Sequence, residues 1–413
     1  MPAAHDYRPR MVDPLLAEIL GEFPAVMLVG PRAIGKSTTA ERYAASVVRL
    51  DRPNEAAIFE ADPDAALQGL PEPILLDEWQ EVPAVLGAVK RAVDRERRPG
   101  RFLLTGSVYA DLQGQTWPGT GRVIRITMHP LTVAERVGRA TKPFLDRIAD
   151  GDELMVSPDP PDILGYADLA LRGGFPEAVI ARSPLFRSRW MQSYLGQMFT
   201  RDPEAIGPSP DPVRLRRFFE AYALNAGGIA TDKTIYDAAD VNSKTAAAYK
   251  RLFENLLVID ELPAWTSNRL KRLTLASKRS VVDSGLWASA LQIDQAAVRS
   301  DGGLLGRLLD IFVTAQLRAE GETAANRPRL YHLRQEHGHH EVDVVAELGA
   351  RRIVGVEIKA TSAPTVRDAR HLAWLRDQLG DRFAAGVVLH TGPRPFKLDD
   401  RIIAAPICSL WAQ

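Results

Sequence analysis

The chain has 413 residues, which suits two or three domains of ~100–200 residues each, and 46% of its residues are hydrophobic and 25% charged. That balance excludes a disordered chain, a collagen-like fibre and a coiled coil, and the apolar runs fall short of the ~18 residues that a membrane helix needs. Fifty-two basic residues balance 52 acidic ones, so the overall charge predicts no polyanionic partner, while the single cysteine, Cys408, excludes an internal disulfide and a Cys-based zinc site. With no secretory pattern at the N-terminus, we expect a cytoplasmic protein without a membrane partner.

Residues 14–145 alternate between helical and strand patterns. Short apolar runs such as AVMLVG, PILLDE and RFLLTGS are separated by helical stretches. Continuous apolar strands between helices are typical of a parallel sheet that helices cover on both faces. We therefore expect an α/β domain over residues 1–145. The expected strands are 25–30, 46–51, 73–78 and 101–107, and the expected helices are 15–23, 36–46 and 84–96.

The rest of the chain divides by composition into three further parts. Residues 146–210 are rich in proline and glycine around one aromatic helix, 188–199, which predicts a helical linker. Residues 211–275 predict a helical, winged-helix-like domain, and residues 276–413 predict a second α/β domain. In that last domain we expect helices over 304–317 and 366–380 and strands over 329–334, 341–348, 351–360 and 383–390.

Residues 30–37, GPRAIGKS, fit the phosphate-loop pattern G-x-x-x-x-G-K-[ST] between an apolar strand and a helix. The glycines allow backbone N–H groups to converge on phosphates, Lys36 can reach the β- and γ-phosphates, and the Ser37 hydroxyl can ligate Mg²⁺. The alternative is an ordinary glycine-rich turn, which the matching context disfavours. We therefore predict ATP and Mg²⁺ as cofactors. The residues expected to contact the nucleotide are Gly30, Pro31, Arg32, Ala33, Ile34, Gly35, Lys36, Ser37 and Thr38.

A second motif, PILLDE, places Asp77 and Glu78 at the carboxyl end of a buried strand, where ligands bind in open parallel sheets. Asp77 would hold Mg²⁺, and Glu78 would polarise the attacking water. The alternative is a pair of acids in an ordinary loop. At the tip of the next strand, Thr105 or Ser107 could contact the γ-phosphate or the water, or simply form a turn. Arg122 could neutralise transition-state charge, in cis or across a subunit boundary, or be a surface arginine.

Two strands of the C-terminal domain carry an acid–acid–lysine set. Glu357 and Lys359 lie two residues apart, on one face of a strand. A turn centred near Ala350 would set Asp343 opposite Glu357, with Cβ atoms ~5 Å apart, and two carboxylates that close need a proton or a cation between them. We predict that Mg²⁺ or Mn²⁺ binds Asp343 and Glu357 there, with Asp310 of the preceding helix as a third acid. Lys359 would orient or deprotonate a water, as in metal-dependent phosphodiester hydrolysis, unless the strands are merely the solvent face of an edge hairpin.

The middle of the chain has helix–turn–helix spacing, with VNS as the turn and KTAAAYKRLFENLL as the second helix. Residues 265–279 add basic side chains that could form a wing on DNA. The alternative is a structural helical subdomain with a solvated charged strip. The second-helix residues available to DNA are Lys244, Thr245, Tyr249, Lys250 and Arg251.

Several segments together resemble one family. FPAVMLVGPRAIGKST, ILLDEWQEVP, FLLTGS, HPLTVAE, RGGFPEAV, VVDSGLWASAL and GGLLGRLLDIFV are similar to segments of bacterial and archaeal AAA-type ATPases that carry a DUF4143-type C-terminal domain. The resemblance implies an ATPase core, a winged-helix-like middle and a restriction-endonuclease-like C-terminal domain, with no established substrate. It also implies nucleotide sensing by Arg122 or Arg201. Asp310 departs from the glutamate more usual in that family, which shortens its reach to a metal.

These observations predict an ATPase that acts on DNA and presents it to a metal-dependent nuclease-like domain. A second hypothesis is a nucleotide-driven switch that binds DNA or a protein and has an inactive nuclease-like fold. The departure at Asp310 and the neutral overall charge favour the second hypothesis. A third is a signalling or toxin-like ATPase, and the sequence leaves open a homo-oligomer.

Overall fold

The computed structural model describes residues 7–107, 120–138, 142–200, 211–335 and 339–412. Packing divides the chain into two compact units, one of residues 1–129 with 253–257 and the other of residues 130–252 with 258–413. The division after residue 129 falls earlier than the expected boundary at residue 145, and the four-part division stays a prediction. Within the described part of the chain, no helix combines the length and the apolar character needed to cross a bilayer.

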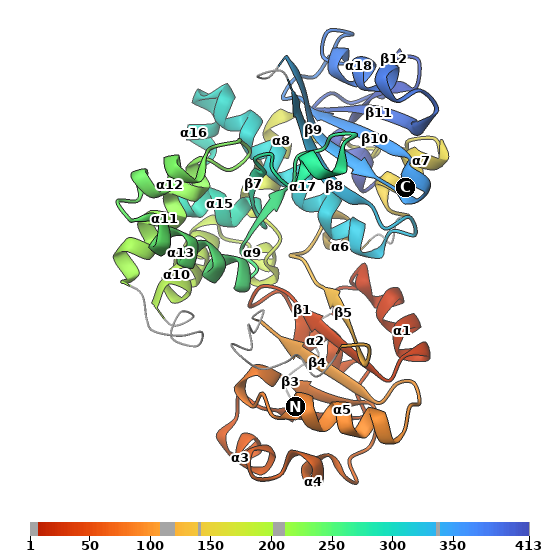
Figure 1. Ribbon diagram of the computed structural model, residues 1–413. Helices are drawn as coiled ribbons and strands as arrows, with labels where there is room; N and C mark the ends of the chain where they lie inside the picture. The colour runs from red at the N-terminus through yellow and green to blue at the C-terminus, as the bar shows by residue number, and fades with distance from the viewer. Residues whose placement is uncertain (1–6, 108–119, 139–141, 201–210, 336–338, 413) are drawn as a thin grey trace. The chain divides into compact units, whose positions relative to one another are not determined.

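A five-stranded parallel sheet forms the centre of the N-terminal unit (Figure 1). Its strands are β1 (Ala25–Val29), β2 (Ser46–Arg49), β3 (Ile74–Asp77), β4 (Phe102–Gly106) and β5 (Val123–Thr127). Their order is β2-β3-β4-β1-β5, so β4 lies between the strand before the phosphate loop and the strand that ends in Asp77. The four expected strands are therefore present, and β5 adds a fifth.

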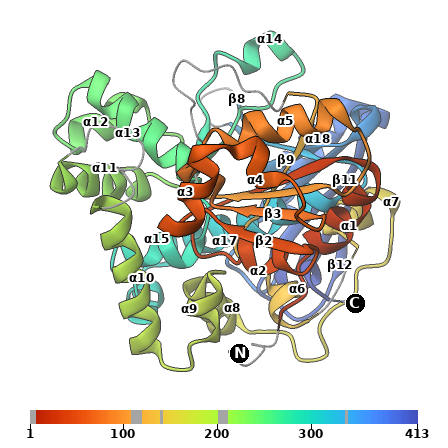
Figure 2. The same ribbon diagram turned by 90° about the horizontal axis from the view of Figure 1, so that it is seen from below.

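Helices cover both faces of this sheet, as the continuous apolar strands predict (Figure 2). The helices are α1 (Val12–Glu22) and α2 (Lys36–Glu41) on one face, and α3 (Pro53–Ala61), α4 (Pro63–Leu67) and α5 (Val85–Arg95) on the other. On the second face, Phe59 and Val89 pack in one buried cluster with Leu76 and Leu104 of the strands. The sequence did not indicate α3 and α4, because residues 53–67 have no clear apolar stripe.

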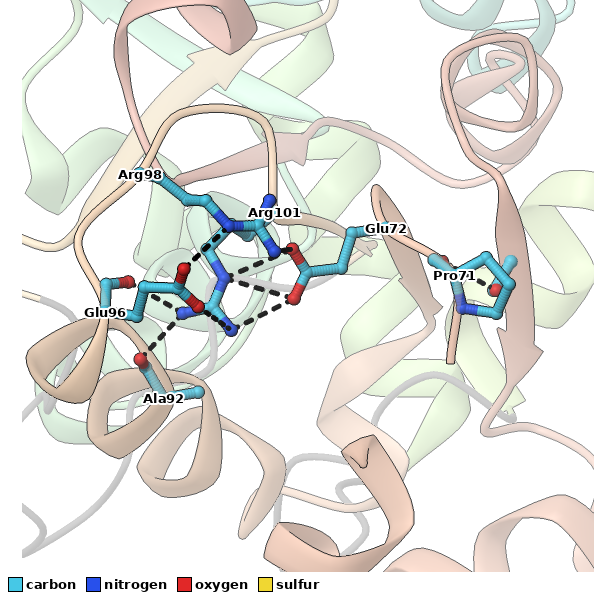
Figure 3. A network of polar contacts seen from close by, with 7 residues as sticks. Pro71, Glu72, Ala92, Glu96, Arg98 and Arg101 are labelled. Atoms are coloured by element: carbon cyan, nitrogen blue, oxygen red, sulfur yellow. Dashed lines mark hydrogen bonds and ion pairs between the residues drawn. The ribbon is translucent and has the colours of Figure 1, made fainter. Parts of the chain in front are cut away.

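A buried arginine joins the amino ends of the strands to α5 (Figure 3). The guanidinium of Arg101, just before β4, donates to the Glu72 carboxylate at 3.0–3.2 Å and to the carbonyls of Ala92 and Glu96 at 2.7 Å. Arg98 contacts the same carboxylate at 2.5 Å. Charge-assisted hydrogen bonds are the stronger kind. This network therefore stabilises the amino ends of the strands, at the end of the sheet opposite the phosphate loop.

A six-stranded mixed sheet lies in the second unit. Its strands, in the order β12-β13-β11-β10-β9-β8, are β8 (Arg329–Gln335), β9 (His340–Glu347), β10 (Ile353–Ile358), β11 (Phe383–His390), β12 (Phe396–Asp399) and β13 (Ile402–Pro406). A short 3₁₀ turn, Gly349–Arg351, joins β9 to β10. The two strands pair in a register that sets Val344 opposite Val356. The expected turn centred near Ala350 is confirmed. The helix α18 (Arg370–Leu379) packs on β9, β10 and β11.

The remaining elements, which belong to this unit except for residues 253–255, are mostly helical. Tyr166 and Phe175 are fully buried within residues 146–200, so this proline- and glycine-rich part is packed, and its Pro176 and Pro184 begin helices. The helices are α6 (Val133–Arg136), α7 (Phe144–Asp150), α8 (Ile163–Arg172), α9 (Pro176–Ile180), α10 (Pro184–Thr200), α11 (Pro212–Leu224), α12 (Asp232–Ala238), α13 (Ser243–Asn255), α14 (Arg269–Arg272), α15 (Ser284–Ala290), α16 (Gln295–Ser300) and α17 (Gly302–Thr323), and the strands β6 (Ile259–Leu262) and β7 (Lys278–Val281) form an antiparallel pair.

Candidate nucleotide-binding site

The phosphate loop runs from Gly30 to Gly35, between the end of β1 and the start of α2. Gly35 has a φ of +92°, in the left-handed region that favours glycine. At Gly30, a Cβ atom would lie 2.4 Å from the carbonyl oxygen of Met128, which is too close for any side chain. The backbone therefore requires both glycines of the motif, as expected for a loop that wraps a phosphate with its N–H groups.

Lys36 projects back into this loop. It is 4% exposed, and its Nζ donates to the carbonyl oxygens of Gly30 at 3.0 Å and Pro31 at 2.8 Å. Burial lowers the pKa of Lys36 to about 8, against the opposite effect of Glu78 and Asp77. The ammonium is thus held at the centre of the loop and close to the acid pair.

Asp77 joins α2 to the sheet. Its Oδ1 accepts a hydrogen bond from Ser37 Oγ at 2.7 Å and another from Thr105 Oγ1, and its Oδ2 lies 3.6 Å from Arg49. The carboxylate is buried, and the hydroxyl and carboxylate oxygens are hard ligands of the kind that Mg²⁺ prefers. Ser37 and Asp77, which lie 40 residues apart, therefore fit the predicted magnesium ion.

Glu78 lies beside the tip of β4. Its backbone has a φ of +53°, uncommon for a residue with a side chain, and its Oε2 accepts from Ser107 Oγ at 3.2 Å and from Gln80. Arg32 of the loop donates to the same Ser107 hydroxyl at 3.3 Å. Because β4 separates β1 from β3, Ser107 connects the phosphate loop with Glu78.

Two arginines at this site were not among the expected residues. Arg10 is buried and donates to the carbonyl oxygens of Ile34 and His129, each at 2.7 Å. It therefore fixes the phosphate loop to the segment that follows β5. Arg49 pairs with Glu41 at 2.7 Å as well as with Asp77. Neither stands in a motif of its own, although RPRM around Arg10 is part of the segment that precedes the loop.

Arg122 lies at the amino ends of the strands, at the end of the sheet opposite the phosphate loop. It immediately precedes β5, whose first residue pairs with Ala25 at the start of β1, whereas the phosphate loop follows the end of β1. Its Nε donates to Asp94 of α5 at 3.0 Å, and its side chain is 40% exposed. A role in cis is therefore at odds with the structure, and only the role across a subunit boundary stays a prediction. Arg201 lies outside the described residues.

The acid–acid–lysine set of the second unit, with Asp310, assembles with a fifth member that the sequence did not indicate. Asp343 accepts from the backbone N–H of Ile358 at 2.9 Å, and Lys359 Nζ donates to Glu357 Oε2 at 2.7 Å. Lys278 of β7 reaches Asp310 Oδ1 at 2.7 Å and Asp343 Oδ1 at 3.8 Å. Two lysines thus lie against the three acids.

Burial and these contacts together set the pKa values of the cluster's side chains. Burial raises the pKa of Asp310 to about 6, and burial together with Asp343 raises the pKa of Glu357 well above its ordinary value. Burial disfavours the charge on Lys278, but Asp310 and Asp343 outweigh that effect and hold its pKa above the ordinary value.

The expected divalent ion does not fit these acids as they stand. Among the described residues, no three acidic, histidine or cysteine side chains are arranged to hold a metal. For Asp310, Asp343 and Glu357, the physical reason is that the ammonium groups of Lys278 and Lys359 already lie against one oxygen of each carboxylate.

The middle helices only partly present the residues expected to face DNA. Lys244 and Arg251 are exposed on α13, but Tyr249 is 7% exposed and packs on Phe218 with ring centroids 5.8 Å apart. Lys250 is held by Glu261 at 2.7 Å. In the basic stretch 265–279, Lys278 and Arg279 are buried in ion pairs, so they are structural.

Comparisons with known families match three parts of the chain. Residues 22–137 match the AAA domain, residues 164–297 match a domain of unknown function, DUF8612, and residues 305–410 match another, DUF4143. The AAA match contains the loop, the acid pair and all five strands of the first sheet.

Two uncharacterized proteins, from Mycobacterium bovis and Mycobacterium tuberculosis, are each 30% identical over 396 residues, covering 95% of this chain and 82% of theirs. Among solved structures, a Walker-type ATPase of Pyrococcus abyssi aligns at 15% identity with a TM-score of 0.44, over 70% of this chain and 97% of that one. The Orc1 protein of Aeropyrum pernix in complex with DNA aligns at 13% identity with a TM-score of 0.28, over 72% of this chain and 94% of that one.

Proposed function

Because the chain belongs to a family of AAA-type P-loop ATPases, which it shares with the two mycobacterial proteins, we propose that it hydrolyses ATP where the phosphate loop meets Asp77 and Glu78. The observation that carries the proposal is the 2.7 Å contact between Ser37 Oγ and Asp77 Oδ1, which brings the loop helix and the acid-bearing strand together. Mg²⁺ held by Ser37 and Asp77 would supply positive charge to the β- and γ-phosphate oxygens.

The surrounding side chains have distinct tasks. Lys36, now held by two loop carbonyls, turns to the phosphates and balances their charge. Glu78 orients a water and takes its proton, since it lies at the strand end beyond Asp77. Ser107 and Arg32 position Glu78 through the hydrogen bonds that link them.

Glu78→Gln tests the assignment of the base. The amide keeps the size of the side chain but cannot take a proton, so we expect ATP turnover to fall on the order of 10²-fold while ATP still raises the melting temperature. Glu81→Gln, an exposed neighbour on the same turn, is the matched control and should turn over ATP normally. Turnover by Glu78→Gln at the rate of the unchanged protein would remove Glu78 from this role.

Action on DNA is the second part of the proposal. The segment from α12 through the turn at 239–242 to α13, followed by the β6–β7 pair, has the element order of a winged helix, and Lys244 and Arg251 are exposed there. We infer that ATP occupancy switches this part on and off DNA. The internal pairing of the acid cluster by Lys278 favours such a switch over a nuclease, because its ammonium group faces one oxygen of Asp310 and one of Asp343.

The switch predicts that the protein does not cut DNA. Plasmid and single-stranded DNA incubated with Mg²⁺ or Mn²⁺ should stay intact, as should the same DNA with a Glu357→Ala/Lys359→Ala variant. Gel electrophoresis decides the question. Cutting that disappears in the variant would overturn the switch and restore the metal-dependent nuclease, whereas cutting that persists in the variant would come from elsewhere.

A further inference from the structure

A hollow of about 650 Å³ opens in the second unit beside α14, the start of β8 and the β9–β10 turn. Its lining contains one carboxylate, Glu347, against five arginines. The whole chain is neutral, with 52 basic and 52 acidic residues, so a basic composition does not explain this concentration of charge. The five arginines are Arg269, Arg272, Arg327, Arg329 and Arg351.

Arg272 and Glu347 form the fixed floor of this arginine hollow. Each side chain is 9% exposed, and they pair at 2.5 Å, while Arg272 Nε donates to the carbonyl of Thr266 at 2.6 Å. The guanidinium also lies 5.3 Å from the ring of Trp265 and 4.9 Å from the ring of Tyr331. A buried ion pair beside two aromatic rings has little freedom to move, so the hollow is a built feature.

The rim of the arginine hollow carries the uncompensated charge. Arg327, Arg329 and Arg351 are exposed, and their side chains have no ion-pair or hydrogen-bond partner within the described part of the chain. Arg269 reaches Glu347 at 3.6 Å but is 64% exposed. Arg327 and Arg351 have φ values of +42° and +63°, uncommon for non-glycine residues.

We propose that the arginine hollow binds the phosphate groups of a single nucleic-acid strand. Guanidinium groups match phosphate oxygens in pairs, and the hollow has the size of pockets that take a small molecule or a few groups of a larger one, ~300–1,000 Å³. A strand fits a concave hollow better than a convex duplex does, and the planes of the exposed rim arginines offer stacking surfaces for bases. The choice of a nucleic acid rests on the proposed action on DNA, whereas the affinity for phosphate does not.

The test compares two triple variants of the full chain. Arg327→Ala/Arg329→Ala/Arg351→Ala removes the rim, and Arg182→Ala/Arg299→Ala/Arg367→Ala removes three exposed arginines elsewhere in the same unit. Binding of a fluorescently labelled DNA strand of about 30 nucleotides is measured by fluorescence anisotropy at several salt concentrations. Each lost phosphate contact lowers the slope of log affinity against log salt by ~0.7, so the rim variant should lose about 2 from the slope and at least ~10-fold in affinity.

Other outcomes separate the site from the rest of the proposed function. Equal affinity and slope for the two triple variants, with binding by the unchanged protein, would assign DNA to another surface and overturn this inference alone. If the unchanged protein binds no strand but binds pyrophosphate, and the rim variant does not, the hollow takes a small phosphate ligand and the nucleic-acid assignment is wrong. ATP turnover and the melting temperature should be the same in both variants, because the six altered side chains have no hydrogen-bond or ion-pair partner among the described residues.

Discussion

Replacing Lys36 by alanine should reduce ATP turnover on the order of 10²–10³-fold. The ammonium is already directed into the phosphate loop by two carbonyls, so phosphates that enter would meet a cation held in place. Removing one such preorganised group from an enzyme site costs ~3–4 kcal/mol of transition-state stabilisation. Turnover is measured as phosphate release, and nucleotide binding as the rise in melting temperature that ATP produces.

Lys90→Ala is the matched control for Lys36, since Lys90 lies in the same unit but is half-exposed and, among the residues that the structure describes, pairs only with Asp94 at 3.5 Å. That variant should keep both turnover and nucleotide binding. Because Lys36 itself is buried, the melting temperature without nucleotide shows whether its variant folds. A folded Lys36→Ala protein that hydrolyses ATP normally would contradict the nucleotide site altogether.

The sequence located those parts of the sites that stand in short motifs with a recognisable local pattern. The phosphate loop is one short motif with a strand and a helix on either side, and its glycines have local backbone reasons. The pairing of β9 with β10 could likewise be predicted, because a turn centred near Ala350 sets the register of both strands. In each case the information lies within about 20 residues, a distance over which pattern and period are informative.

What the sequence did not reveal depends on long-range packing. Arg10 supports a loop whose carbonyl lies 24 residues away, and Lys278 meets Asp310 from a strand 32 residues earlier. Both sit in ordinary basic stretches, and no local pattern separates a buried arginine or lysine from an exposed one. For Arg122 the local motif suggested a role that the packing does not support. The pairing of β5 with β1 places this arginine at the end of the sheet away from the phosphate loop.

Lys278→Met should lower the free energy of unfolding of the second unit by about 3–5 kcal/mol, because it leaves Asp310 buried without its closest cation. Burial already raises the pKa of Asp310 to about 6, and loss of Lys278 raises it further, so the folded variant holds a proton there that the unfolded chain releases at lower pH. Stability of the variant, measured by urea unfolding, should therefore fall as the pH rises from 4 through 6 and above.

Two further variants make this result specific to the buried pair. Lys278→Met/Asp310→Leu removes both charges and should regain most of the loss at neutral pH, since replacing a whole buried ion pair by apolar side chains is often neutral. Lys250→Met, whose ion pair with Glu261 at 2.7 Å is a quarter exposed, should cost only about 0–1 kcal/mol. A Lys278→Met protein as stable as the unchanged one at pH 8 would show that Asp310 and Asp343 do not depend on this lysine, and the acids would again be open to a metal ion.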